Sequence, residues 1–159
     1  MSEDHTKSHR EMFIHYIEED IPFNKVLGMK VTHLERGRAV CEVPFRRELI
    51  GDIFRPAIHG GVVSTLIDAT GGVAGFSLIE VVDRISTVDM RVDYLRPGLE
   101  DRLIADAEVV RMGNRVCVVH VVVHQGDKDK PIADGRCVYN VRRNVGFPVD
   151  KTGGGGSQA

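Results

Sequence analysis

A histidine, two glycines and an aspartate stand close together near the middle of this 159-residue chain. His59, Gly60 and Gly61 precede an apolar segment of small residues that is long enough for a helix, with Asp68 in its middle. The first amides of a helix lack intrahelical partners and lie at its positive end, and glycines leave them open to an approaching carbonyl oxygen. This spacing is typical of an oxyanion hole followed, two turns on, by a carboxylate that acts as nucleophile or general base.

The same residues also have simpler interpretations. Gly60 and Gly61 suit a tight turn leading into a helix, and an aspartate within a helix is usually solvated or bonded to a nearby hydroxyl such as Ser64 or Thr65. His59 is either a base or a group that holds its loop through a backbone hydrogen bond. Spacing alone leaves these alternatives open.

Other chemistries lack their usual motifs, since the sequence contains no GxSxG, Walker, HExxH or CxxC pattern. His120 and His124 lie on a predicted strand that separates them by roughly 13 Å, too far to share one metal ion. Cys41, Cys117 and Cys137 stand far apart in strand-like runs and are interpreted as reduced packing residues. We therefore expect neither a metal site nor a cofactor.

Length and charge narrow the class of protein further. A chain of 159 residues with a formal net charge of -2 and interspersed charges predicts one domain without a nucleic-acid or anionic-lipid surface. The sequence has no apolar run of the ~20 residues that span a bilayer, and Met1–Arg10 lacks the hydrophobic segment of a secretory signal. We expect a cytoplasmic protein with no membrane partner.

The elements that must position the site follow from hydrophobic periodicity. Helical spacing predicts a short helix over Ser8–Ile21 that stops at Pro22, and a long central helix within Pro56–Leu78. Strands are predicted, in chain order, over Met29–Leu34 and Arg38–Phe45 as a hairpin, then over Ser86–Leu95, Leu103–Met112, Arg115–Gln125 and Ile132–Val141, with a loop over Glu48–Ile58. This order predicts an α+β fold in which a largely antiparallel sheet of about six strands curls around the long helix.

Alternation along two of the strands gives their faces. In Ser86–Leu95, Val88 and Met90 fall on one face while Thr87 and Asp89 fall on the other. The run Arg115–Gln125 is so rich in valine that we expect a central strand covered on both faces.

The long helix has two different sides. One apolar stripe, Val62, Val63, Leu66, Ile67, Thr70, Val73 and Ala74, is expected to face the sheet. The other side carries Ser64, Asp68, Gly71, Gly72 and Gly75, which are too small for an ordinary solvent face. Such a face indicates close approach by a second subunit or by a ligand.

At these residues the sequence resembles the hotdog-fold acyl-CoA thioesterases, in particular the PaaI-like branch related to the 4-hydroxybenzoyl-CoA thioesterases. The resemblance rests on His59-Gly60-Gly61, on Asp68 and on the run Ser86–Pro97, and it extends over about residues 22–141. It implies a hotdog domain over 22–145. The preceding residues, 1–21, are predicted as a helix and leader from their periodicity, and residues 146–159, which contain four consecutive glycines, as a flexible tail from their composition. The resemblance also implies a homodimer, often paired into a tetramer, that hydrolyses an acyl-CoA to the free acid and CoA.

The resemblance assigns roles residue by residue. Asp68 matches the catalytic carboxylate, Gly60 matches the backbone N–H that polarises the thioester carbonyl, and Thr87 matches a hydroxyl that orients the water. Asp68 would act across the dimer interface from the Gly60 that completes its site. For the CoA part, the resemblance points to the turn Gly113-Asn114-Arg115 and to Arg96, with a solvated hairpin tip as the alternative for the turn.

The chain departs from the family pattern just before the motif. Many relatives have an amide side chain six residues before the histidine and a glycine three residues before it, where this chain has Ile53 and Pro56. A water held by Thr87 and Asp68, or direct attack by Asp68, would replace the amide. Two other functions remain open: a hotdog 3-hydroxyacyl-thioester dehydratase or hydratase with His59 as base, and a non-catalytic acyl-CoA-binding protein.

Overall fold

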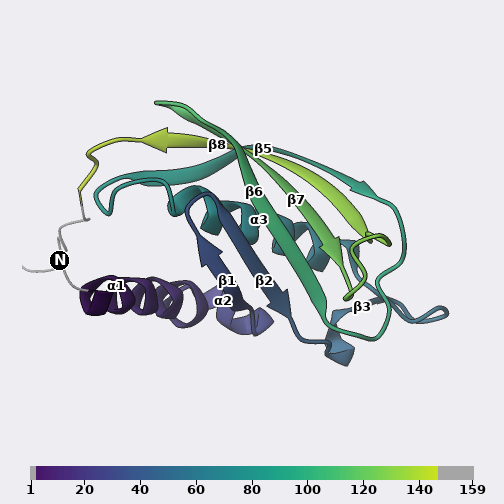
Figure 1. Ribbon diagram of the computed structural model, residues 1–159. Helices are drawn as coiled ribbons and strands as arrows, with labels where there is room; N and C mark the ends of the chain where they lie inside the picture. The colour runs from purple at the N-terminus through teal and green to yellow at the C-terminus, as the bar shows by residue number, and fades with distance from the viewer. Residues whose placement is uncertain (1–2, 147–159) are drawn as a thin grey trace, which may run out of the picture.

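In the computed structural model, which describes residues 3–146, one long helix lies against the inner face of a curved antiparallel sheet (Figure 1). The helices are α1 (Glu3–His15), the π-helical turn η1 (Tyr16–Asp20), α2 (Pro22–Leu27), the 3-10 turn η2 (Arg47–Leu49) and α3 (Gly60–Phe76). The strands are β1 (Lys30–Glu35), β2 (Arg38–Val43), β3 (Ile50–Asp52), β4 (Ala57–Ile58), β5 (Arg84–Tyr94), β6 (Leu103–Met112), β7 (Val116–His124) and β8 (Ala133–Arg142). The predicted α+β hotdog architecture is confirmed.

The main sheet has six strands in the order β1-β2-β6-β7-β8-β5, and every neighbouring pair is antiparallel. β7 lies between β6 and β8, as its valine content predicts. Its inner side chains are fully buried against α3, whereas its outer face includes the half-exposed Val116 and the exposed His120. The expectation that both faces of this strand are covered is therefore not met in the single chain.

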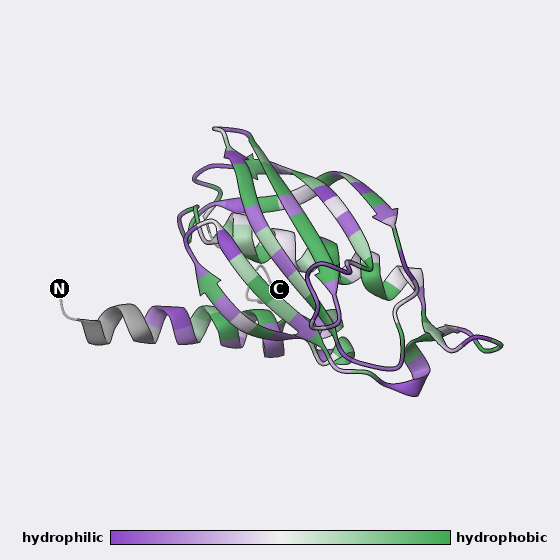
Figure 2. Cartoon of the chain, turned by 45° about the vertical axis from the view of Figure 1, so that its right-hand side comes forward, coloured by the Kyte–Doolittle hydropathy of each residue, from purple (hydrophilic) through white to green (hydrophobic). Residues whose placement is uncertain are grey.

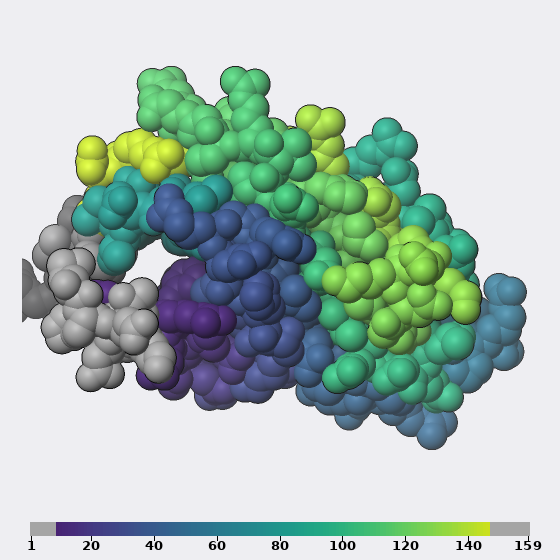
Figure 3. Space-filling model, viewed as in Figure 1, coloured from purple at the N-terminus to yellow at the C-terminus, as the bar shows by residue number. Residues whose placement is uncertain are grey.

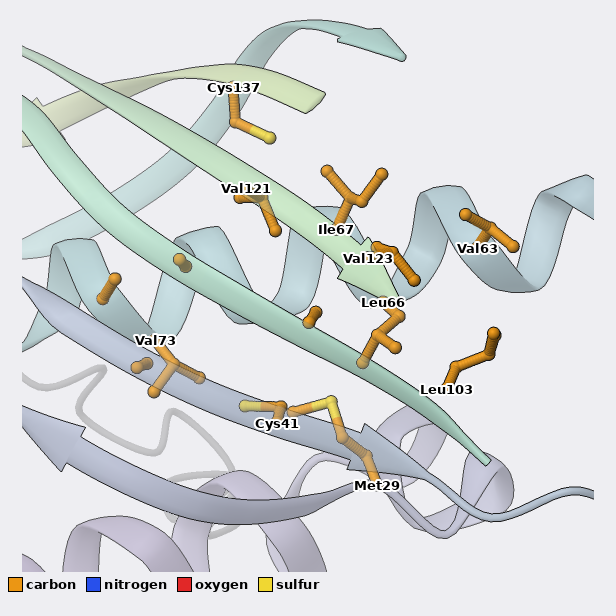
Figure 4. Close-up of a cluster of buried hydrophobic side chains, with 14 of the residues drawn as sticks. Met29, Cys41, Val63, Leu66, Ile67, Val73, Leu103, Val121, Val123 and Cys137 are labelled. Carbon is orange, nitrogen blue, oxygen red and sulfur yellow. The ribbon is translucent and has the colours of Figure 1, made fainter. Parts of the chain in front are cut away.

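The core fills the space between α3 and the sheet. Leu66 and Ile67 point from the helix towards the strands, and Val121 and Cys137 point inward from β7 and β8 (Figure 4); each of these four side chains is fully buried. Burial of an aliphatic side chain such as leucine, isoleucine or valine contributes about 1.5–3 kcal/mol, so this layer stabilises the fold substantially. The strands show alternating hydrophobic and hydrophilic bands (Figure 2), the pattern of a sheet with one buried face.

The N-terminal segment differs from the single helix predicted to stop at Pro22. α1 gives way at Tyr16 to a π-helical turn, and Pro22 begins α2 because the first position of a helix needs no N–H donor. Glu18 fixes the turn to β1 through Lys30 Nζ and the Val31 amide, each at 2.8 Å. Figure 3 shows these N-terminal elements, in purple, packed against the blue β1–β2 hairpin.

The segment predicted as a loop before the helix contains a small hairpin. Within Glu48–Ile58, β3 and β4 pair with each other and not with the main sheet. Strands this short give no sustained period, so the sequence does not reveal them. The hairpin presents Ile53 at its tip, 79% exposed, and brings Gly51 so close to His59 that an added Cβ would lie 2.7 Å from the His59 Cα.

The predicted C-terminal tail and the predicted lack of a membrane span concern the ends and the helices of the chain. Of the predicted tail over 146–159, residues 147–159 lie outside the described residues. Among the helices of the described part, none has the length and apolarity to cross a membrane. The cytoplasmic location and the domain boundaries stay predictions.

Candidate active site

The histidine of the motif caps the long helix. His59 has an extended backbone, and its Nδ1 accepts a hydrogen bond of 2.8 Å from the Gly61 amide, while its carbonyl accepts one of 2.9 Å from the Val62 amide. Because Nδ1 is the acceptor, the proton of the neutral ring lies on Nε2. This geometry supports the interpretation of His59 as the residue that holds the loop.

The cap decides which amide is left for an oxyanion. The Gly61 amide, expected to be free, is taken by His59, so the first amide of α3, that of Gly60, is the donor that the cap leaves open. Tyr94 lies over this glycine: its hydroxyl donates to the Gly60 carbonyl over 3.1 Å, and an added Cβ would lie 3.3 Å from its ring. A side chain at Gly60 would therefore press on the Tyr94 ring, which would have to shift by a few tenths of an ångström. Tyr94 belongs to the predicted strand Ser86–Leu95, and no motif in the sequence indicates its contact with Gly60.

The structure brings Asp68 and Thr87 together. Thr87 Oγ1 donates a hydrogen bond of 2.7 Å to Asp68 Oδ1. Ser64 and Thr65, proposed as alternative partners of this carboxylate, donate instead to the Gly61 carbonyl at 3.1 Å and 2.8 Å. Asp68 is half-buried, and its second oxygen, Oδ2, is not used in the contact with Thr87.

A β-bulge aims Thr87 at the helix. The pairing of β5 with β8 shifts at Val88, so that Thr87 opposes Tyr139 and Met90 opposes Cys137, two buried residues of the inner face. The predicted placement of Thr87 on the face opposite to Met90 is therefore wrong. Simple alternation fails here because the bulge inserts one extra residue, Val88. Residues before the bulge therefore point to the opposite face from the one that alternation counted from Met90 predicts.

Tyr139 fixes the helix at the same level. Its hydroxyl donates to the Asp68 carbonyl over 2.7 Å, and its side chain is 2% exposed. Burial raises the pKa of Tyr139 well above its usual range, so the phenol stays protonated and remains a donor. The backbone that carries the carboxylate is thereby held by a bond from β8.

Asp68 and Thr87 line a cleft of about 390 Å³. On the side of α3 its wall is formed by Ser64, Thr65, Asp68, Ala69, Gly72, Val73 and Phe76, and on the sheet side by Ile85, Ser86, Thr87, Met90 and Tyr139. The third wall comes from the N-terminal segment, through Ile17, Ile21, Phe23 and Asn24. Polar groups stand near Asp68 and the remainder is mostly apolar, the usual character of a pocket for a small organic ligand.

The small face of the helix is narrower than predicted. A Cβ at Gly71 would collide with the Tyr139 hydroxyl, and one at Gly75 would lie 2.7 Å from Ile85 Cδ1, so these two glycines allow close packing on the sheet. The prediction that Gly71 and Gly75 face a ligand or a second subunit is therefore wrong. Gly72 does line the cleft, together with Asp68.

The residues predicted to contact CoA lie at opposite ends of the sheet. Arg96 follows β5 and donates to the Pro131 carbonyl over 2.9 Å. The turn Gly113-Asn114-Arg115 precedes β7 at the end where Arg84 pairs with Arg142, and Arg143 bonds the Gly113 and Asn114 carbonyls. One chain therefore does not bring Arg96 and this turn together.

The two histidines of β7 and the three cysteines have partners or burial that account for them without a metal ion. His120 bonds Asp134 and His124 bonds Asp106, each over 2.8 Å, and Cys41, Cys117 and Cys137 are buried free thiols. Within residues 3–146 no three His, Cys, Asp or Glu side chains are grouped to hold a metal ion.

A long helix wrapped by an antiparallel sheet is the hotdog fold, and a carboxylate at the position of Asp68, facing a cleft, is the feature that the resemblance assigns to the hotdog thioesterases. Residues 56–132 match the family described as the thioesterase superfamily. The chain is 30% identical to the medium/long-chain acyl-CoA thioesterase YigI of Escherichia coli over 144 residues, which cover 82% of this chain and 90% of the relative. The chain belongs to the thioesterase superfamily, and the resemblance to hotdog-fold acyl-CoA thioesterases is confirmed.

Solved structures agree with this assignment. A thioesterase family protein from Silicibacter pomeroyi superposes with a TM-score of 0.72 at 26% identity, covering 82% of this chain and 98% of that chain. A protein from Shewanella oneidensis related to the thioesterase superfamily gives 0.73 at 28% identity, covering 82% and 93%. The chain is accordingly an enzyme of thioester hydrolysis.

Proposed function

We propose that this protein hydrolyses an acyl-CoA thioester to the free acid and CoA, with Asp68 as the reacting carboxylate. The observation that carries the proposal is the Thr87–Asp68 hydrogen bond of 2.7 Å at the mouth of a mostly apolar cleft. The relative from Escherichia coli, named as an acyl-CoA thioesterase, supports the substrate class.

The hydrogen bond from Thr87 occupies Oδ1 and orients the carboxylate. Oδ2 then either takes a proton from the water that attacks the thioester carbonyl carbon or attacks that carbon itself. In both routes the C–S bond breaks, and the CoA sulfur leaves as thiolate. In the first route the proton that Asp68 takes from water passes to the thiolate or to solvent, which regenerates the carboxylate. In the second route a water molecule hydrolyses the mixed anhydride between Asp68 and the acyl group, which releases the free acid and a proton that neutralises the thiolate. The carbonyl oxygen gains negative charge in the transition state, and a backbone N–H stabilises it there.

The carboxylate and the oxyanion donor of one chain cannot act on one carbonyl. Asp68 follows Gly60 by eight residues in α3, which separates them by about 12 Å along the helix axis. The reaction therefore requires the Gly60 amide of a second copy. This supports the homodimer expected from the sequence, and a tetramer would be a pairing of such dimers.

The edge of the sheet offers the dimer contact. β5 is the last strand in the sheet order and pairs only with β8 among the described strands, so its outer edge presents unpaired backbone groups. Two copies of β5 paired antiparallel around a two-fold axis would extend the sheet across both chains. The axis would exchange the two ends of β5, placing Thr87 and Asp68 of one copy beside Tyr94 and Gly60 of the other.

Charges on β5 favour one register of this pairing. Asp89 and Arg91 both lie on the outer face, opposite Val138 and Arg136 of β8. Pairing centred on Met90 places Asp89 opposite Arg91 of the second copy, twice by symmetry. Centring on Arg91 would instead oppose two arginines, and Asp89 would oppose Asp93, which is unfavourable.

The same two-fold axis would bring the residues predicted to contact CoA close together across the two copies. It brings Arg96, which follows one end of β5, to the end of the second copy that carries the turn Gly113-Asn114-Arg115. Arginine suits the phosphates of CoA because its guanidinium forms bidentate, charge-assisted hydrogen bonds. We propose that Arg96 of one chain and this turn of the other hold the CoA part.

The dehydratase or hydratase alternative needs His59 as a proton acceptor. Its Nδ1 lone pair already accepts the Gly61 N–H at 2.8 Å, and its Nε2 carries the ring proton. A base would have to give up the cap of α3 before it could act. Hydrolysis through Asp68 requires no such change.

The test is release of free thiol from a panel of acyl-CoAs, followed with a thiol reagent. Asp68→Asn and Asp68→Ala should each lower kcat by at least about a hundredfold, the usual effect of removing a general base or nucleophile. Light scattering should show the same oligomer for both variants. A rate equal to that of the original chain in Asp68→Ala would overturn the proposal, as would loss of water from 3-hydroxyacyl-CoAs without thiol release.

A further inference from the structure

Gly72 differs from the other glycines in the second half of α3. The side chains of β8 and β5 leave no room for a Cβ at Gly71 or Gly75. At Gly72, apart from the helix's own backbone, the described atom nearest to an added Cβ is Tyr139 Cε1, at 4.0 Å. A glycine inside a helix destabilises it relative to alanine, and the packing of the described residues does not require one here.

The space over Gly72 continues from the reacting carboxylate. Asp68 and Gly72 are one turn apart on the same side of α3 and line the same cleft. One turn further, Phe76 lines the cleft as well, and its ring packs on that of Phe13 with centroids 6.1 Å apart. From Asp68 to Phe76 the helix advances about 12 Å.

The wall opposite the helix is made by the N-terminal segment. Ile17, Ile21 and Phe23 come from η1 and α2 and from the residue between them, outside the matched family region 56–132. Ile17 is 3% exposed, and the neighbouring Asn24 amide is occupied by a bond of 3.0 Å to the Ile17 carbonyl. The deep part of the cleft therefore offers hydrocarbon surface and few polar groups.

We propose that the acyl chain of the substrate runs along α3 from Asp68 over Gly72 towards Phe76, and that Gly72 sets the longest chain the enzyme accepts. The inference rests on the proposed thioester hydrolysis. The chemistry that fits is an unbranched aliphatic acyl group, because the path beside the helix is apolar and reaches Phe76, whose ring packs on that of Phe13. A side chain at position 72 would stand across this path.

The test is a size series, Gly72→Ala, Gly72→Val and Gly72→Leu, assayed with butyryl-, octanoyl-, dodecanoyl- and hexadecanoyl-CoA. The ratio of kcat/KM for the longer chains to kcat/KM for butyryl-CoA should fall stepwise with side-chain size, by roughly tenfold or more in Gly72→Leu, since single contacts in an apolar pocket discriminate by such factors. Circular dichroism and thermal melting would confirm that each variant is folded. An equal loss for all four substrates would overturn the inference.

Two further outcomes are decisive. If Gly72→Leu abolishes the dimer in light scattering but keeps the original chain-length ratio, the surface around Gly72 belongs to the subunit contact and the inference is wrong. If the original chain releases thiol from no acyl-CoA, the proposed function fails separately. Calorimetric binding of octanoate and hexadecanoate then tests the cleft: weaker binding of hexadecanoate by Gly72→Leu supports the inference, and equal binding by both proteins refutes it.

Discussion

Thr87 donates a hydrogen bond of 2.7 Å to Asp68, and it reaches this carboxylate only because β5 contains a bulge at Val88. The two residues are nineteen positions apart and come from the edge strand and the central helix. The hydrogen bond thus joins β5, at the edge of the sheet, to α3, the helix against which the core packs. A hydroxyl that donates to one carboxylate oxygen fixes the direction of the other, which is the requirement for a positioned base or nucleophile.

Removal of the hydroxyl should impair the reaction without unfolding the chain. Thr87→Val keeps the shape of the side chain but leaves Asp68 without its donor, so kcat should fall about tenfold to a hundredfold, the value of a hydrogen bond to a charged group. Thr87→Ser retains the donor and should keep most of the rate. Steady-state thiol release from one acyl-CoA measures all three proteins. Equal rates for Thr87→Val and the original chain would contradict the role of the hydroxyl.

Adjacent glycines in α3 should respond oppositely to alanine. Gly71→Ala places a methyl group against the Tyr139 hydroxyl and should lower the free energy of unfolding by about 1–3 kcal/mol, as overpacking usually does. Gly72→Ala makes only an ordinary van der Waals contact with Tyr139 Cε1, at 4.0 Å, and should raise the free energy of unfolding by about 0.5–1 kcal/mol, because alanine is the better helix former. Urea unfolding of both variants measures the difference. Similar changes of the same sign would contradict the packing described for the two positions.

The sequence predicted the fold well because its elements have strong periods. The long helix falls inside the predicted segment Pro56–Leu78, and the strands over Leu103–Met112 and Ile132–Val141 appear within one residue of their predicted bounds. The site was predicted less completely, because its geometry depends on a β-bulge and on long-range contacts, which hydrophobic periodicity does not reveal. The bulge at Val88 changes the face of Thr87, and the contact of Tyr94 with Gly60 joins residues thirty-four positions apart.

The proposed cooperation between two copies follows only in part from the motif. Asp68 and Gly60 are named by the motif, but the separation of about 12 Å between them along one helix follows from the helix geometry. The apolar wall formed by Ile17 and Phe23 carries no motif at all. Only the docking of η1 onto β1 through Glu18 brings it to the cleft.

Charge reversal on β5 should test the proposed dimer. Arg91→Asp would place like charges opposite each other in the register centred on Met90 and should shift the equilibrium towards monomer. The double variant Asp89→Arg, Arg91→Asp restores opposite charges and should recover the dimer. Light scattering over a range of concentrations gives the association constants, and thiol release should follow the fraction of dimer. A stable, active dimer in Arg91→Asp would exclude this register.

Acid should destabilise the end of the sheet that carries the turn Gly113-Asn114-Arg115. Hydrogen bonds from the Asn144 amide and from Arg143 lower the pKa of the Asp83 carboxyl, which is 3% exposed. Because the folded pKa lies below the unfolded value of about 3.9, the stabilisation is complete above that value and is lost as the pH falls through the folded pKa. Between about pH 7 and pH 3 the melting temperature should therefore fall less steeply for Asp83→Asn than for the original chain. Parallel curves would show that Asp83 does not contribute.

The three buried thiols should not react with the thiol reagent in the assay that detects released CoA. Burial raises the pKa of Cys41 to about 12 and that of Cys137 to about 11, and it also raises the pKa of Cys117. Since the thiolate is the reactive form, all three remain protonated and inert at the pH of a thiol-reagent assay. The folded protein should give no signal, and denaturant should expose three thiols. A thiol that reacts in the folded protein would show that the core opens on the timescale of the assay, and Cys41→Ala, Cys117→Ala and Cys137→Ala would identify which strand is involved.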